Sequence, residues 1–91
     1  MSRPSNPGVL VKRSVVLHGH ATSVALEPDF WSALDGWARM DGESVAAVIA
    51  RIDARRKQGS LASAIRVALF ARAIAERDEA LRMLETAARR R

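Results

Sequence analysis

Residues 21–26 alternate between two faces of an extended chain. Thr22, Val24 and Leu26 share one parity, and the residues between them share the other. Alternation over this length predicts a half-buried strand. Because Val24 and Leu26 are the large apolar members, their face is expected to meet the core. The outward positions are then Ala21, Ser23 and Ala25.

Two short helices are expected after this strand. Glu27-Pro28-Asp29 ends it, since proline suits a first helical turn and acids suit the positive end of a helix dipole. Asp41-Gly42 ends the first helix, and Ser44 is placed to cap the second. Trp31 lies at the edge of the first apolar stripe, where it packs on the N-terminal segment or on a partner. The stripes comprise Phe30, Leu34, Trp37 and Ala38 in the first helix and Val45, Val48, Ile49 and Ile52 in the second.

A long helix is predicted from Leu61 to the end of the chain, because this stretch has no proline or glycine. Gly59 stops the preceding helix and Ser60 caps the new one. The first half, residues 61–75, is apolar nearly all round and is expected to be buried. The second half is amphipathic. A seam with one polar break follows three-four spacing through Val67, Phe70, Ile74, Arg77, Leu81, Leu84 and Ala88.

The N-terminal part divides into an arm and an apolar segment. Residues 1–8 contain two prolines, a glycine and two serines and predict a flexible arm. Val9–Leu17 is an extended segment that either pairs as an extra strand or lies across the helices, and periodicity does not choose. The predicted organisation is an arm at 1–8, a core at 9–58 and a helical extension at 59–91.

One strand and two helices do not make a core alone, because a lone strand leaves its backbone groups unpaired along both edges. A second copy solves this, with two strands pairing antiparallel across a two-fold axis. The expected fold is therefore mainly α, with one short strand pairing across a homodimer and a long C-terminal helix. The predicted dimer core comprises Val24, Leu26, Leu34, Trp37, Val48, Ile49 and Ile52.

The order strand, helix, helix over Ser23–Ile52 resembles the ribbon-helix-helix DNA-binding repressors of the MetJ and Arc type. More narrowly, HGHATSVALEPDFWSAL is similar to a ribbon-helix-helix family of small bacterial proteins, mostly of unknown role. That similarity extends from about Lys12 to Leu69. It implies a dimer that places an antiparallel β-ribbon in the major groove of DNA.

Composition narrows the classes of function. The chain has 91 residues and a net charge of +5, which favours nucleic acid or acidic surfaces as partners. It has no cysteine, which fits a reducing cytoplasm, and no apolar run long enough to span a bilayer. His18 and His20 lack a third ligand, so no metal is expected. No phosphate loop or catalytic triad is present, and we expect neither an enzyme nor a cofactor.

Two functions follow from these patterns. The first is a transcriptional regulator that binds DNA. Its candidate contacts are Lys12, Arg13, Ala21, Ser23, Ala25, Ser44, Val45, Ala46, Arg55, Arg56 and Lys57. Relatives of the narrower family often have arginine where this chain has Ala21 and Ala25, and alanine forms no hydrogen bond to a base. The second function is therefore a protein-interaction or assembly module that keeps the fold, with the C-terminal helix holding a partner or extending the dimer.

Overall fold

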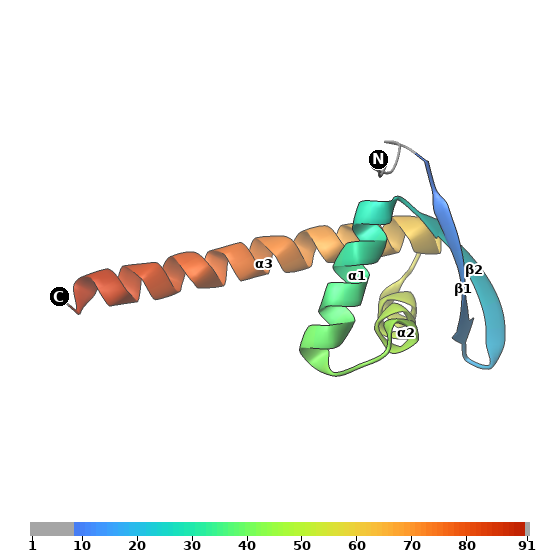
Figure 1. Ribbon diagram of the computed structural model, residues 1–91, viewed down its shortest axis with the longest axis horizontal. Helices are drawn as coiled ribbons and strands as arrows, with labels where there is room; N and C mark the ends of the chain where they lie inside the picture. The colour runs from blue at the N-terminus through green and yellow to red at the C-terminus, as the bar shows by residue number, and fades with distance from the viewer. Residues whose placement is uncertain (1–8, 91) are drawn as a thin grey trace, which may run out of the picture.

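A computed structural model describes residues 9–90 as a two-stranded sheet followed by three helices (Figure 1). The predicted arm at 1–8 lies outside the described residues. The order is that of a ribbon-helix-helix fold with a long third helix, so the predicted fold class is confirmed. The elements are β1 (Val11–Leu17), β2 (His20–Leu26), α1 (Pro28–Asp41), α2 (Val45–Arg55) and α3 (Leu61–Arg89).

The sheet is a hairpin within one chain. β1 and β2 pair antiparallel, from Val11 opposite Leu26 to Leu17 opposite His20. The two residues between the strands, His18 and Gly19, both have positive φ, at 53° and 81°. Two-residue hairpin turns of this kind match the twist of the strands. Of the alternatives for the Val9–Leu17 segment, pairing as an extra strand is confirmed. The expectation of a lone strand that needs a second copy to pair is therefore corrected: β2 pairs within its own chain, because the tight turn brings β1 back beside it.

The helix ends follow the predicted signals. Pro28 begins α1, and Gly42 ends it in the left-handed conformation with φ 65°. The hydroxyl of Ser44 accepts a hydrogen bond from Ala47 N at 3.0 Å, and that of Ser60 accepts one from Ser63 N at 3.0 Å. Each serine satisfies a backbone donor that a helix start would leave free. The caps therefore fix where α2 and α3 begin.

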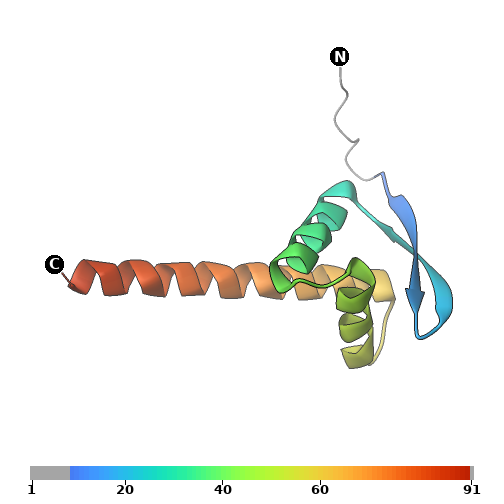
Figure 2. The ribbon, with the colours of Figure 1, turned by 60° about the horizontal axis from the view of Figure 1, so that its bottom comes forward.

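The core lies between the hairpin and the helices (Figure 2). β1 packs beside α2, and β2 beside α3. Trp31 is fully buried, whereas Trp37 packs against the core only partly. The stripe of α1 is therefore rotated toward Trp31, because β1 supplies a surface on that side. The buried side chains are Leu17, Val24, Leu26, Trp31, Leu34, Ala38, Val48, Ile49, Ile52, Ile65 and Leu69.

The long helix α3 leaves the rest of the molecule after its first few turns (Figure 1). Its length is as predicted, but the expected burial of residues 61–75 is wrong. Only Ile65 and Leu69 are buried, because α1, α2 and the hairpin lie on one side of α3 and no other described part of the chain covers the opposite side. Among residues 9–90, no helix has both the length and the apolar character needed to cross a bilayer.

Candidate nucleic-acid interface

The hairpin has two faces of different chemistry. Residues directly opposite each other in an antiparallel pair lie on the same face. The inner face carries Leu17, Val24 and Leu26, which are buried against the helices. The outer face pairs Lys12 with Ala25, Ser14 with Ser23, and Val16 with Ala21. The parity predicted for β2 is therefore confirmed, and β1 adds three outward side chains to it.

Arg13 lies on the inner face, away from Lys12. Its guanidinium donates to both carboxylate oxygens of Asp35, at 3.2 and 3.3 Å, and lies 4.5 Å from the centre of the Trp31 ring. The indole Nε1 of Trp31 in turn donates to Val11 O at 2.7 Å. Together these contacts tie β1 to α1. Arg13, which the sequence suggested for DNA contact, is thus engaged within the protein.

The other candidate contacts lie apart from the outer face. Residues of α2 share the core with the inner face, so α2 stands behind the hairpin (Figure 2). The N-terminus of α2 that holds Ser44, Val45 and Ala46 therefore does not continue the outer face, and the Ser44 hydroxyl already satisfies one of its N–H groups.

The basic run after α2 is engaged in part. Arg56 donates to Asp53 at 2.9 Å and to Gly59 O at 2.8 Å, which braces the turn before α3. Arg55 and Lys57 are exposed, and among residues 9–90 neither they nor Lys12 form an ion pair. Of the basic residues suggested for DNA contact, these three remain available to phosphates.

Trp37 sits where the three helices meet. Its Nε1 donates to Asp41 Oδ2 at 2.9 Å, and the guanidinium of Arg72 lies 4.7 Å from the ring centre. Arg51 approaches Asp41 at 3.4 Å and Glu43 at 2.7 Å. The hydrogen bond from Trp37, aided by that from Arg51, lowers the pKa of Asp41. The carboxylate therefore stays ionised and links α1 with α2 and α3.

A second polar link joins the end of β2 to α3. Arg66 donates through Nε and Nη2 to Glu27 Oε1, at 2.9 and 2.8 Å. A backbone hydrogen bond at Glu27, and then the hydrogen bond from Arg66, lower the pKa of this carboxyl. Arg66 and Glu27 neutralise each other at this junction, so Arg66 fixes the position of α3 relative to the end of β2.

Sequence reasoning missed Ser14 and Val16 as members of the outer face. Both are exposed, and each faces a predicted position across the hairpin. The signal that could have identified them is His18-Gly19 between two extended segments. Glycine at the second position of a two-residue loop is typical of a hairpin turn, because it readily adopts positive φ. Pairing the runs around that turn gives the register at once.

The histidines lie at the hairpin turn, His18 within it and His20 at the start of β2. Over residues 9–90, no three histidine, aspartate or glutamate side chains gather in a way that could hold a metal ion. The hairpin turn requires the positive φ of Gly19, which explains a glycine at this position. The imidazoles are exposed and take no part in the core.

Comparison with known proteins identifies one family. A family model described as a ribbon-helix-helix domain matches residues 10–73, which is more than half of the chain. The match spans the hairpin, α1, α2 and the part of α3 that packs against them. No curated protein and no solved structure matches the chain.

Proposed function

Because the chain belongs to the ribbon-helix-helix domain family, we propose that it is a DNA-binding regulator that works as a homodimer, with the outer ribbon face in the major groove. The observation that carries the proposal is the outer face itself. It is a two-stranded ribbon over which no helix of residues 9–90 lies, and the major groove admits an element of this width.

The outer face favours backbone contact with limited readout of bases. Lys12 supplies a positive charge for a phosphate, and the hydroxyls of Ser14 and Ser23 can donate to or accept from base edges. Val16 and Ala21 offer apolar contact to thymine methyl groups. A face with two serines and one lysine discriminates less than one with arginines. We therefore propose binding that depends strongly on salt and weakly on sequence.

A second copy would double this face. Both strands are edges of a two-stranded sheet, and an unpaired edge is a template for another strand. A homodimer would present two ribbons and twice the +5 charge of one chain, which raises affinity for the phosphate backbone.

A salt series of binding to duplex DNA tests the proposal with two matched variants. Lys12→Ala should weaken binding and reduce the slope of log affinity against log salt by about 0.9 per chain, because one phosphate contact is lost. Arg82→Ala removes the same charge from the exposed far part of α3 and should leave the slope nearly unchanged. Equal effects of the two substitutions would mean that charge alone binds DNA and that the ribbon has no special role.

The assembly module remains the second candidate, because α3 exposes large apolar side chains that a monomeric soluble protein rarely leaves in one stripe. Absence of duplex binding by the parent at low salt, together with self-association, would favour this function.

A further inference from the structure

The side of α3 that faces away from the hairpin carries a stripe of large apolar side chains. Val67 is 65% exposed, Phe70 69% and Leu84 66%, and Ile74 and Leu81 are exposed as well. With Arg77 between Ile74 and Leu81, these positions recur at alternating spacings of three and four, which places them in one row. The residues that pack on the core, Ile65 and Leu69, occupy the opposite side of the helix. The row is hereafter the outer stripe of α3.

We propose that the outer stripe pairs antiparallel with the outer stripe of a second copy of this chain. Apolar residues at a strict seven-residue repeat are the pattern of two helices that pack side by side. Antiparallel pairing centred between Ala75 and Glu76 sets Val67 against the second copy's Leu84 and Phe70 against its Leu81. Each apolar side chain that is exposed in one chain is then covered by one from the other.

Arg77 is the one charged residue within the stripe, and it fits this pairing. In the antiparallel register it lies beside the second copy's Ile74, near the centre of the contact. Its guanidinium is 3.8 Å from the carboxylate of Asp78, at the side of the stripe. The aliphatic part of the side chain can therefore cover the isoleucine while the charge stays in water, as long basic side chains commonly do.

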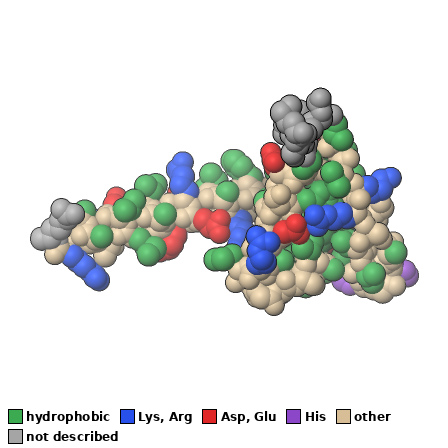
Figure 3. Space-filling model, in the orientation of Figure 1, with side chains coloured by type: hydrophobic (Ala, Val, Ile, Leu, Met, Phe, Trp, Pro, Cys, Tyr) green, Lys and Arg blue, Asp and Glu red, His purple; other side chains and the backbone are tan. Residues whose placement is uncertain are grey.

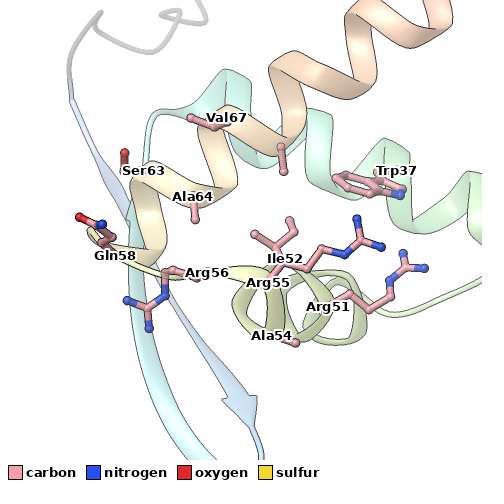
Figure 4. A pocket seen from close by; sticks show the side chains of 11 residues that line it. Trp37, Arg51, Ile52, Ala54, Arg55, Arg56, Gln58, Ser63, Ala64 and Val67 are labelled. Carbon is pink, nitrogen blue, oxygen red and sulfur yellow. The ribbon is translucent and has the colours of Figure 1, made fainter.

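A groove between α2 and α3 favours antiparallel over parallel pairing of the two α3 helices. It has a volume of about 690 Å³, with Ala64, Val67 and Ala68 on α3 and Ile52 on α2 among its apolar lining. Figure 4 shows Trp37 and Arg51 at one end of the groove and Arg56 and Gln58 at the other. Arg55 also lines it and forms no ion pair among residues 9–90, so α2 places a positive charge beside the outer stripe.

Beside the outer stripe, on the side of the groove, α3 carries small residues in its N-terminal half and acidic residues in its C-terminal half. Positions seven apart along it are Ala64, Ala71, Asp78 and Glu85. Like flanks meet in an antiparallel pair of helices, so the second copy's Glu85 lies over Ala64, on the side of α3 that Arg55 of α2 faces across the groove. The alanines leave room for the approach, and the opposite charges favour it.

Parallel pairing lacks this complementarity. It would keep Glu85 near the C-terminal end of α3, about 27 Å along the helix from the level of Val67 at 1.5 Å per residue. The opposite flank, Arg66, Ala73, Ala80 and Ala87, offers no acidic residue to exchange. Charge and groove therefore both select the antiparallel arrangement, in which the tail of each copy covers the exposed Phe70 of the other. The hydrophobic surface along α3 is visible in Figure 3.

The first test is the mass of the assembly by light scattering at one protein concentration. Leu84→Lys and Phe70→Lys should each reduce the mass of the parent assembly toward that of one chain, because a lysine in the outer stripe would place a charge in the apolar contact. Met83→Lys is the matched control, because Met83 is 64% exposed on the same helix but lies off the stripe, and its mass should equal that of the parent. Equal masses for all four proteins would overturn the proposal, as would equal loss in the control.

The second test determines whether the two α3 helices pair antiparallel or parallel, and it uses substitutions that add no charge. The chain has no cysteine, so Phe70→Cys and Leu81→Cys can be made singly and treated with a short bis-maleimide crosslinker. Antiparallel pairing predicts crosslinks in the mixture of the two variants. Leu81→Cys alone should not react with itself, since its two copies would stand about 16 Å apart along the axis. Self-crosslinking of Leu81→Cys, or no crosslinks in the mixture, would overturn the proposal.

Discussion

The two faces of the hairpin share one backbone and differ in every other respect. The inner face buries three apolar side chains and engages Arg13 with Asp35 and Trp31. The outer face carries short polar and apolar side chains and the exposed Lys12. Neighbours in sequence, Lys12 and Arg13, therefore have different roles. The difference shows that a basic pair is no evidence of a basic patch until the parity of the strand is known.

The largest contrast between the faces should come from a buried charge. Val24 is 3% exposed on the inner face, and Val24→Asp should destabilise the protein by several kcal/mol, because an unpaired carboxylate would be taken out of water. Val16 is 62% exposed on the outer face, and Val16→Asp should change the free energy of unfolding by about 0.5 kcal/mol or less. Urea denaturation of both variants measures the difference. Similar midpoints for the two would contradict the assignment of the faces.

A smaller contrast separates the two tryptophans. Trp31→Phe removes the donor to Val11 O and leaves that carbonyl without its partner, so a loss of about 1–2 kcal/mol is expected. Trp37→Phe removes a hydrogen bond to the exposed Asp41 and should cost less, because water replaces it. Thermal denaturation gives the ranking. A larger loss for Trp37→Phe would show that β1 is not held to α1 in this way.

The smallest effect should be a dependence of stability on acid pH. The folded protein lowers the pKa of Glu27 and of Asp41, so the unfolded chain binds their protons first as pH falls. Their contribution is complete at neutral pH and is lost as pH drops through about 4, the usual range of carboxyl groups, and below it. Glu27→Gln should reduce the loss between pH 7 and pH 3 in urea midpoints. An unchanged loss of stability at low pH would show that Glu27 does not contribute to the pH dependence.

Sequence patterns predicted the parts that depend on local chemistry. The alternation of Val24 and Leu26, the caps at Ser44 and Ser60, and the length of α3 are all as expected. What the patterns left open or missed depends on which elements meet. Of the two places expected for Trp31, packing on the N-terminal segment is confirmed, because β1 folds back over α1. The exposure of Phe70 was missed, because no described element reaches that side of α3. Periodicity identifies an apolar face and leaves open what covers it.

The candidate site divides in the same way. The parity of β2 predicted Ala21, Ser23 and Ala25 as outward, while the contribution of β1 needed the hairpin register. Lys12 and Arg13 were grouped together, because a basic pair in an extended segment of unknown pairing has no assigned face. DNA binding by these residues is the proposal, and the hairpin register places Ala25 opposite Lys12 as the position at which to test it.

The most direct measurement is a titration of the parent and Ala25→Arg against duplex DNA at two salt concentrations. Ala25 lies opposite Lys12 on the outer face, where a long side chain fits without entering the core. The like charge across the hairpin should cost no more than about 1 kcal/mol of stability. If the outer face binds DNA, Ala25→Arg should tighten binding and steepen its salt dependence by about 0.9 per new phosphate contact. Unchanged or weaker DNA binding by the folded variant would contradict the account.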